Sequence, residues 1–226
     1  AGAGAGAQEP KLSREVVVIQ IEQGDLVLGF YPEVAPKTVE NILANFALGS
    51  YNGASFFRVD KGFVAQVEDV MGKSASPLGR AVRMNEEQQR HGKKTVPLEP
   101  SDIEHKRGIL SLGRFDDPNS GTNSFSIVLG DAPHLDGRYT VFGKLLEGYD
   151  VLDKLEQVET YTKGMWVKPV KPIPIHSTYV KHYRWEAEGR GPSASCGECE
   201  ERAQTLQASL EHQAVEMHNL RQKCLP

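Results

Sequence analysis

The first fifty residues of the chain show two patterns of hydrophobic positions, the first typical of strands and the second of a helix. Segment 15–22 is rich in β-branched residues and bounded by polar ones, and a turn separates it from the similar segment 26–30. This pattern predicts a β-hairpin. Apolar side chains then recur at i, i+3, i+4 and i+7 between Pro36, which suits a first helical turn, and Gly49, which suits a helix end. An amphipathic helix is therefore expected there.

Shorter apolar runs, separated by turn residues, follow along the rest of the chain. They predict a second pair of strands at 56–67 and further strands at 108–113, 124–129, 139–144 and 171–180. A second helix is predicted around 149–155, whereas 71–94 is polar, has little periodicity and is expected to be a long surface loop. Many short strands with two amphipathic helices indicate a mainly β fold, a closed antiparallel barrel covered by helices.

The composition is that of a globular protein with one domain of ordinary size and an appendage. The chain has 226 residues, of which 39% are apolar and 25% charged. A net charge of −4 and the lack of a basic stripe argue against a nucleic-acid partner. No apolar run approaches the ~18 residues that a membrane-spanning helix needs, so no membrane span is expected.

The C-terminal part of the chain differs in composition from the rest. Residues 186–197 form a linker-like run. In 198–226, the positions that follow a 4-3-4 spacing are occupied by mostly apolar residues, and only Gln213 interrupts this series. That spacing predicts a helix in a coiled coil, which would make the protein a homodimer or dock it onto a larger complex. A single amphipathic helix that packs back on the barrel is the alternative.

All three cysteines, Cys196, Cys199 and Cys224, lie near this end of the chain. A lone CxxC without a second pair or nearby histidines gives little support for zinc, so no metal is expected. A disulfide within the chain or between chains, or no special role, is expected for these cysteines instead. At the other end, the Ala/Gly-rich residues 1–13 begin without methionine and are expected to be flexible. They suit either a cloning scar or the region after a removed targeting signal, and the second origin favours a lumen such as that of the endoplasmic reticulum.

Segment 57–66 carries the candidate chemistry. It places a cation, Arg58, a large aromatic, Phe63, and an amide, Gln66, among apolar neighbours. A guanidinium is always charged and presents five N–H donors in a rigid array. Such a set can anchor a carbonyl and stabilise a distorted bond without any proton transfer. On spacing alone, a half-buried strand with Arg58 and Gln66 on its polar face is the alternative.

Four segments, in the right order and spacing, resemble signature motifs of the cyclophilins. They are 34–41, 57–66, 108–112 and 134–144. The resemblance assigns 14–185 to a cyclophilin-like domain and implies an eight-stranded antiparallel barrel capped by two helices. The implied activity is peptidyl-prolyl cis-trans isomerisation of proline-containing polypeptides, without a cofactor. With its tail, the chain is most similar to the divergent plant-type cyclophilins that carry a C-terminal coiled coil.

The same resemblance implies roles for individual residues. Arg58 matches the catalytic arginine, Gln66 the amide that holds the substrate backbone, and Phe63 the wall of the proline pocket. The implied substrate-binding set is Phe63, Val64, Leu112, Gly113, Phe125, Ser126, His134, Leu135 and Tyr139. Within this set, Leu112 and Leu135 match apolar positions that line the pocket.

The opposite wall of the pocket departs from the family pattern. Where Gln-Phe-Phe is usual, the chain has Ser-Phe-Ser, so that without gaps Ser126 replaces a pocket phenylalanine and Ser124 a substrate-binding glutamine. A shift by one residue would instead bring Phe125 into the pocket, with Asn123 in the amide role. Strand alternation makes this choice all or nothing.

Further departures loosen the pocket. Gly113 and Arg114 stand where Ala-Asn is usual, His134 replaces a frequent tryptophan, and Tyr139 replaces a common histidine. We therefore expect a weak isomerase with poor affinity for cyclosporin. The alternative is a binding or structural module of cyclophilin fold whose pocket has lost its activity, held in a complex by its C-terminal helix.

Overall fold

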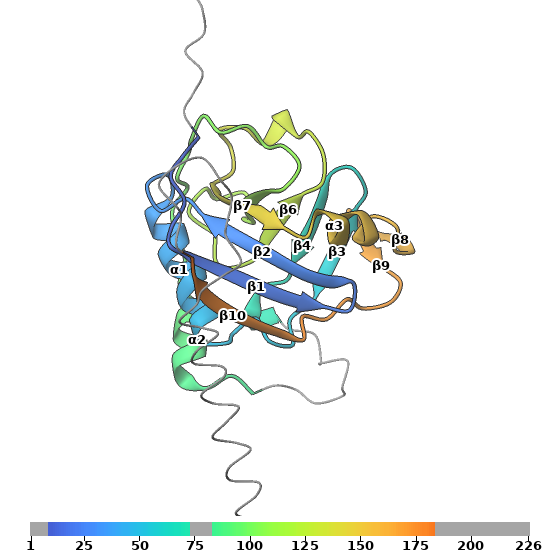
Figure 1. Cartoon of the computed structure of the whole chain (residues 1–226), viewed down its shortest axis with the longest axis horizontal. Helices are drawn as coiled ribbons and strands as arrows, with labels where there is room; N and C mark the ends of the chain where they lie inside the picture. The colour runs from blue at the N-terminus through green and yellow to red at the C-terminus, as the bar shows by residue number, and fades with distance from the viewer. Residues whose placement is uncertain (1–8, 73–82, 184–226) are drawn as a thin grey trace, which may run out of the picture. The chain divides into compact units, whose positions relative to one another are not determined.

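One curled antiparallel sheet forms most of the structure. The computed structural model describes residues 9–72 and 83–183, and within them eight strands pair in the order β10-β1-β2-β7-β5-β6-β4-β3 (Figure 1). They are β1 (Glu15–Ile21), β2 (Gly24–Phe30), β3 (Phe56–Asp60), β4 (Val64–Val67), β5 (Ile109–Leu112), β6 (Phe125–Val128), β7 (Val141–Glu147) and β10 (Ser177–His182). Each strand falls in or overlaps a segment where the sequence predicts one, so the mainly β class is confirmed.

Several predictions concern parts of the chain outside the described residues. The linker at 186–197, the coiled-coil helix at 198–226 and all three cysteines lie there, as do residues 1–8. These features remain predictions.

The closed barrel expected from the sequence is wrong, because the sheet is an open half-barrel. Strands β3 and β10 are its two edges and do not pair with each other. The reason lies in segment 171–180, of which only the part from Ser177 onward becomes strand β10. Pro172 and Pro174 lack the backbone N–H that a continuous ladder requires. The first part of the segment therefore forms no continuous ladder with the opposite edge of the sheet. It meets that edge near an isolated bridge between Ser55 and Pro174.

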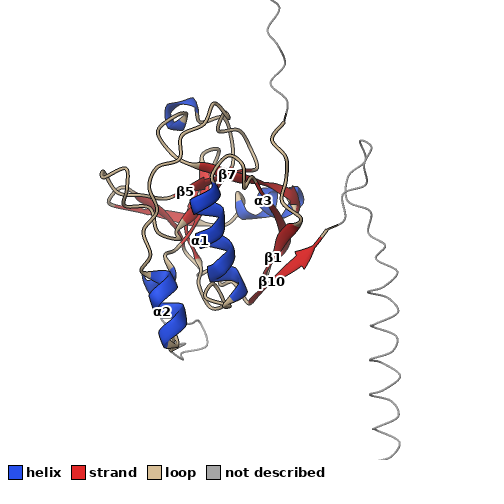
Figure 2. Ribbon diagram, turned by 90° about the vertical axis from the view of Figure 1, so that its left-hand side faces the viewer, coloured by secondary structure: helices blue, strands red, loops and turns tan. Residues whose placement is uncertain are grey.

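Two predicted helices cover the sheet from different sides. Helix α1 (Pro36–Ala47) lies across the mouth of the half-barrel and buries Val39, Ile42 and Phe46 in the core (Figure 2). Helix α3 (Tyr149–Leu155) packs against β2. Both helices present one apolar face, as the 3.6-residue period requires.

A third helix is missing from the sequence prediction. Helix α2 (Glu86–Gly92) packs against α1 and lies in segment 71–94, which was expected to be a loop. Its side chains are mostly exposed, so no apolar stripe marks it. The usable signal was its capping box: Asn85 accepts a hydrogen bond from the backbone N–H of Gln88, and the Gln88 side chain accepts one from the N–H of Asn85.

Smaller elements complete the described part of the chain. A separate hairpin of β8 (Thr160–Lys163) and β9 (Trp166–Pro169) was not predicted, because its residues are all exposed or half-buried and show no alternation. Two short 3₁₀ helices are η1 (Val70–Gly72) and η2 (Pro133–Leu135). The hairpin lies at the same end of the molecule as α3 (Figure 1).

The core fills the concave side of the sheet under α1. The Phe125 ring lies near its centre, with centroids 5.8 Å from that of Phe142, 5.7 Å from that of Tyr51 and 6.1 Å from that of Phe46. All three contacts have the edge-to-face geometry that aromatic rings prefer. Phe125 is completely buried by these contacts.

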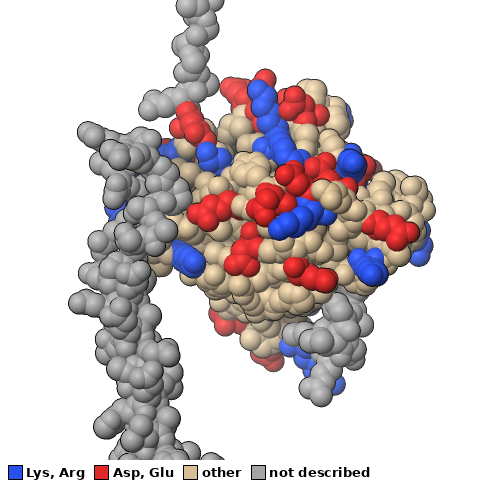
Figure 3. Space-filling model, turned by 45° about the vertical axis from the view of Figure 1, so that its right-hand side comes forward, with Lys and Arg blue, Asp and Glu red and all other residues tan. Residues whose placement is uncertain are grey.

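The surface shows no concentration of one charge on the face drawn in Figure 3. Basic and acidic side chains are interspersed there among uncharged residues. Among the described residues, no helix is long and apolar enough to cross a membrane.

Helix α1 is capped by a residue from a distant loop. Its N-cap, Ala35, has no side-chain acceptor. The Glu99 carboxylate instead accepts hydrogen bonds from the N–H of Lys37 at 3.0 Å, the N–H of Thr38 at 2.9 Å and the Thr38 hydroxyl at 2.7 Å. A carboxylate at this position also interacts favourably with the helix dipole.

We expect Glu99→Ala to lower the free energy of unfolding by about 1–2 kcal/mol, because two helix N–H groups and a hydroxyl lose their acceptor. Urea denaturation measures the change. Glu104→Ala is the control, since it removes an exposed carboxylate that pairs with the exposed Lys106, and it is expected to change stability little. Equal effects of the two substitutions would contradict the capping role.

Candidate active site

A row of polar side chains crosses four neighbouring strands on the face of the sheet opposite the core. Arg58 on β3 pairs with Gln66 on β4, Gln66 with Ser126 on β6, and Ser126 with Ser111 on β5. Residues paired directly across strands point to the same face of a sheet. Segment 57–66 is thus a strand pair, and its Arg58 and Gln66 lie in a row with two serines far away in sequence.

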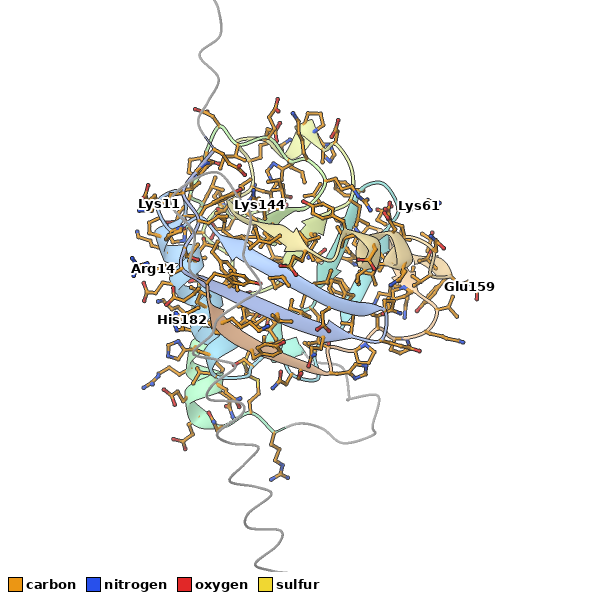
Figure 4. All side chains as sticks on the ribbon, in the orientation of Figure 1. Lys11, Arg14, Lys61, Lys144, Glu159 and His182 are labelled. Atoms are coloured by element: carbon orange, nitrogen blue, oxygen red, sulfur yellow. The ribbon has the colours of Figure 1, made fainter. Side chains whose placement is uncertain are left out.

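The row forms one side of a surface pocket of about 130 Å³. The pocket contains nine of the eleven residues that the sequence assigns to the site: Arg58, Phe63, Val64, Gln66, Leu112, Gly113, Ser126, Leu135 and Tyr139. Lys61, which lies in the turn between β3 and β4, points outward into solvent instead (Figure 4).

Phe125 is not part of the pocket, and its assignment as a substrate-binding residue is wrong. It points into the core, while Ser126 lines the pocket. The one-residue shift is excluded by the same register, since Gln66 faces Ser126. Asn123 does not take the substrate-binding amide role either. Its side chain accepts a hydrogen bond from the N–H of Val70 at 2.7 Å and donates one to the carbonyl of Gly92 at 2.8 Å.

His134 supports the pocket from outside and does not line it. It lies on η2, is exposed, and places its ring 5.1 Å from the ring of Phe63. An imidazole at this distance restricts the Phe63 side chain. The neighbouring Leu135 on the same 3₁₀ helix does reach the pocket.

Arg58 is held rigidly at the edge of the pocket. Its Nη2 donates to Asp60 at 2.9 Å, and its guanidinium carbon lies 5.1 Å from the Phe63 ring centroid and 5.5 Å from that of Trp166. Cation–π contacts with two rings and one ion pair restrict the position of the group. Its Nε is buried and has no hydrogen-bond partner among the described residues. The guanidinium is therefore a preorganised positive charge with donor capacity to spare.

The amide of Gln66 is positioned by a short chain of hydrogen bonds. Its Nε2 donates to the hydroxyl of Ser124 at 3.1 Å, and that hydroxyl donates to the carbonyl of Val67 at 2.8 Å. Gly113 makes room for this arrangement, since a Cβ at that position would lie 3.1 Å from Gln66 Nε2 and 3.0 Å from the carbonyl oxygen of Ser124. Glycine at this position, where the family usually has alanine, thus leaves space for the hydrogen bond between Gln66 and Ser124.

Three pocket residues were not assigned from the sequence: Ser111, Arg114 and Trp166. Ser111 carried a signal, because it is the polar residue between two leucines in a predicted strand. Arg114 stacks on Tyr139, with its guanidinium carbon 4.6 Å from the ring centroid. Trp166 carried no such signal, because it lies on the β8–β9 hairpin, which the sequence did not predict.

A metal site is not apparent in the described part of the chain, where no group of three or more histidine, cysteine, aspartate and glutamate residues is arranged to hold an ion. The pocket instead combines a fixed guanidinium, an amide and apolar walls on the outer face of a curled antiparallel sheet. This combination is the one that the resemblance to isomerases of proline peptide bonds implies. The chain belongs to the cyclophilin family, whose model, described as cyclophilin-type peptidyl-prolyl cis-trans isomerase, matches residues 16–180.

Similar proteins agree with this assignment. A peptidyl-prolyl cis-trans isomerase of Arabidopsis thaliana, CYP23, is 47% identical over 218 residues, which cover 96% of this chain and 89% of that protein. The human peptidyl-prolyl cis-trans isomerase-like 3 is 35% identical over 71% of this chain and 96% of its own. A cyclophilin-type isomerase from Cryptosporidium parvum is a solved structural neighbour, with a TM-score of 0.61, 27% identity, and coverage of 75% of this chain and 99% of that one. A second structure of that protein, determined in the presence of the dipeptide Ala-Pro, has a TM-score of 0.59 and 28% identity, and covers 74% of this chain and 98% of that one.

Proposed function

We propose that the protein accelerates rotation about X-Pro peptide bonds by means of Arg58, with Gln66 holding the substrate backbone. The observation that carries this proposal is the guanidinium of Arg58, fixed by Asp60 and two aromatic rings beside an apolar pocket. The substrate would be a proline-containing polypeptide. The Cryptosporidium structure obtained in the presence of Ala-Pro supports that substrate class.

The chemistry needs differential binding and no proton transfer. A planar peptide bond resists rotation with a barrier of ~18–20 kcal/mol because the nitrogen lone pair is delocalised into the carbonyl. At the twisted transition state the lone pair is localised on nitrogen and becomes a hydrogen-bond acceptor. A guanidinium N–H directed at that nitrogen binds the twisted form more tightly than the planar one, which lowers the barrier.

The other pocket residues would hold the substrate during rotation. Phe63, Leu112 and Leu135 offer apolar surface for the proline ring, and burial of the ring excludes water from the guanidinium. Gln66 would bind the backbone of the residues before proline through its amide. One side of the bond is thereby anchored while the other turns.

We further propose that activity on ordinary proline is reduced, since a serine lies where the family usually has a phenylalanine. Ser126→Phe is expected to raise kcat/KM for an Ala-Pro peptide about fivefold, because roughly 1 kcal/mol of additional apolar burial would act on the ring. NMR exchange spectroscopy between the cis and trans peptide measures the rate. Ser126→Ala removes the hydroxyl without filling the space and is expected to raise the rate less. A folded Ser126→Phe protein with lower activity would show that Ser126 is not the cause of a weak pocket.

A catalytically lapsed binding module is the second candidate. Two observations favour it: Ser126 lines the pocket where the family usually has a phenylalanine, and Gln66 already donates to Ser124. The same exchange assay separates the two functions. A wild-type rate no higher than that of the peptide alone, combined with measurable binding of the peptide, would identify the protein as a binding module.

A further inference from the structure

The floor of the pocket is polar, although its walls are apolar. Ser126 lies between Gln66 and Ser111 in the cross-strand register, so two hydroxyl-bearing side chains from adjacent strands lie next to each other at the pocket. Phe63 and Leu135 line the same pocket. A plain hydrocarbon ring could form no hydrogen bond with this pair of hydroxyls.

The Ser126 hydroxyl has no protein partner within the described residues. The residue is only 9% exposed, and the part of its surface that remains open faces the pocket. The hydroxyl is not one of the fully buried unpaired groups, so water can reach it through the pocket. A group that enters the pocket can supply the missing partner.

The Ser111 hydroxyl is in contact with a buried histidine. Asp136 accepts hydrogen bonds from the backbone N–H and the ring Nδ1 of His105, both at 2.8 Å. The backbone hydrogen bond from His105, followed by the ring contact, holds the pKa of the Asp136 carboxyl below its usual range, so it is ionised at neutral pH. The Nδ1 atom of His105 faces this carboxylate and carries a proton, while Nε2, on the other side of the ring, lies 3.0 Å from the Ser111 hydroxyl. In either direction of that contact, the hydroxyl keeps at least one lone pair free of His105. This lone pair of Ser111 is left to accept a hydrogen bond from the pocket.

We propose that this pocket recognises proline rings that carry a hydroxyl group, with Ser126 and Ser111 as the specificity-determining residues. The inference rests on the proposed function, because it names the substrate class of the same site. The ring nitrogen and Cα belong to the peptide backbone and stay near Arg58 and Gln66, so Cγ, the ring atom farthest from the backbone, enters first. A hydroxyl on Cγ can donate to Ser111 and accept from Ser126.

The ring of unmodified proline offers no hydrogen bond to the two serines at the pocket floor. Its methylene groups would either cover both hydroxyls or leave a trapped water between the ring and the serines. The pocket volume of about 130 Å³ is roughly ten times what one water molecule requires, so a ring with an additional hydroxyl is not excluded by size. A ring hydroxyl replaces that water and keeps its hydrogen bonds, which makes the exchange favourable.

The test compares matched peptides on the full chain. Peptides contain alanine followed by proline, by either epimer of 4-hydroxyproline, or by 4-fluoroproline, which has a similar electronic effect on the ring but cannot donate a hydrogen bond. For each peptide, NMR exchange gives the acceleration over the uncatalysed rate, and titration of ¹⁵N-labelled protein gives the dissociation constant. The variants are Ser126→Ala, Ser111→Ala and a control, Ser101→Ala, which removes a buried hydroxyl that also lacks a described partner but lies outside the pocket.

We expect one hydroxyproline epimer to exceed proline in both acceleration and affinity, and fluoroproline to behave like proline. The hydroxyproline-to-proline ratio is expected to fall about fivefold in Ser126→Ala, to fall also in Ser111→Ala, and to stay unchanged in Ser101→Ala.

Two different failures can be told apart. If the proline peptide is accelerated but neither epimer exceeds it, or if Ser126→Ala leaves the ratio unchanged, the inference is overturned and the isomerase function stands. If no peptide is accelerated, the proposed function fails, and the ratio of the dissociation constants alone then decides whether the floor selects a hydroxylated ring.

Discussion

Arg58→Ala is expected to lower kcat/KM for an Ala-Pro peptide by roughly 10²–10³-fold. Removal of a preorganised donor directed at a developing charge typically has an effect of this size. Arg58 is well prepared for that role, because Asp60 and the rings of Phe63 and Trp166 hold its guanidinium in place before substrate binds. Peptide affinity is expected to change much less than the rate, since the interaction forms only as the bond twists.

Arg58→Lys makes the test more specific. Lysine keeps the charge but lacks the planar fork that can bond Asp60, contact two aromatic rings and still present a free N–H. We therefore expect it to lose at least about tenfold in kcat/KM. NMR exchange spectroscopy measures both variants, and circular dichroism checks that they are folded.

The matched control for both variants is Lys61→Ala. Lys61 is a cation three residues from Arg58 that is exposed and points into solvent (Figure 4). Its removal is expected to leave the rate within about twofold of wild type. If folded Arg58→Ala kept more than half of the wild-type rate, the arginine-centred mechanism would be wrong.

Phe125→Ala is expected to lower the free energy of unfolding by about 3–5 kcal/mol, the range seen when large aromatic side chains are truncated in a core. Phe125 is completely buried and contacts the rings of Phe46, Tyr51 and Phe142. Its removal leaves a cavity that these rings cannot all move to fill. Urea denaturation monitored by circular dichroism measures the loss.

The neighbouring Ser126→Ala provides the control, and is expected to change stability by less than about 1 kcal/mol. The two substitutions lie side by side on β6 but on opposite faces of the sheet. Phe125→Leu should fall between them, since it keeps part of the buried volume. Similar losses for Phe125→Ala and Ser126→Ala would contradict the register of β6.

Local elements and the central motif were predictable because their signals are local. The strand pair at 56–67 and helix α1 follow from the spacing of apolar residues that are close together in sequence. The motif from Arg58 to Gln66 is predictable for the same reason, since a tight hairpin brings the two residues into register across β3 and β4. Four of the assigned pocket residues come from this hairpin: Arg58, Phe63, Val64 and Gln66.

The features that escaped prediction depend on segments far apart in the chain. Whether Phe125 or Ser126 faces the pocket is decided by pairing of β6 with β4 and β5, which no local pattern reports. Trp166 reaches Arg58 only through the β8–β9 hairpin, and Glu99 caps α1 from 61 residues away. The open half-barrel likewise depends on how the proline-containing segment before β10 meets the opposite edge. Hydrophobic periodicity is a property of neighbours in sequence, whereas register, closure and contacts between distant loops arise only when the whole sheet has packed around its core.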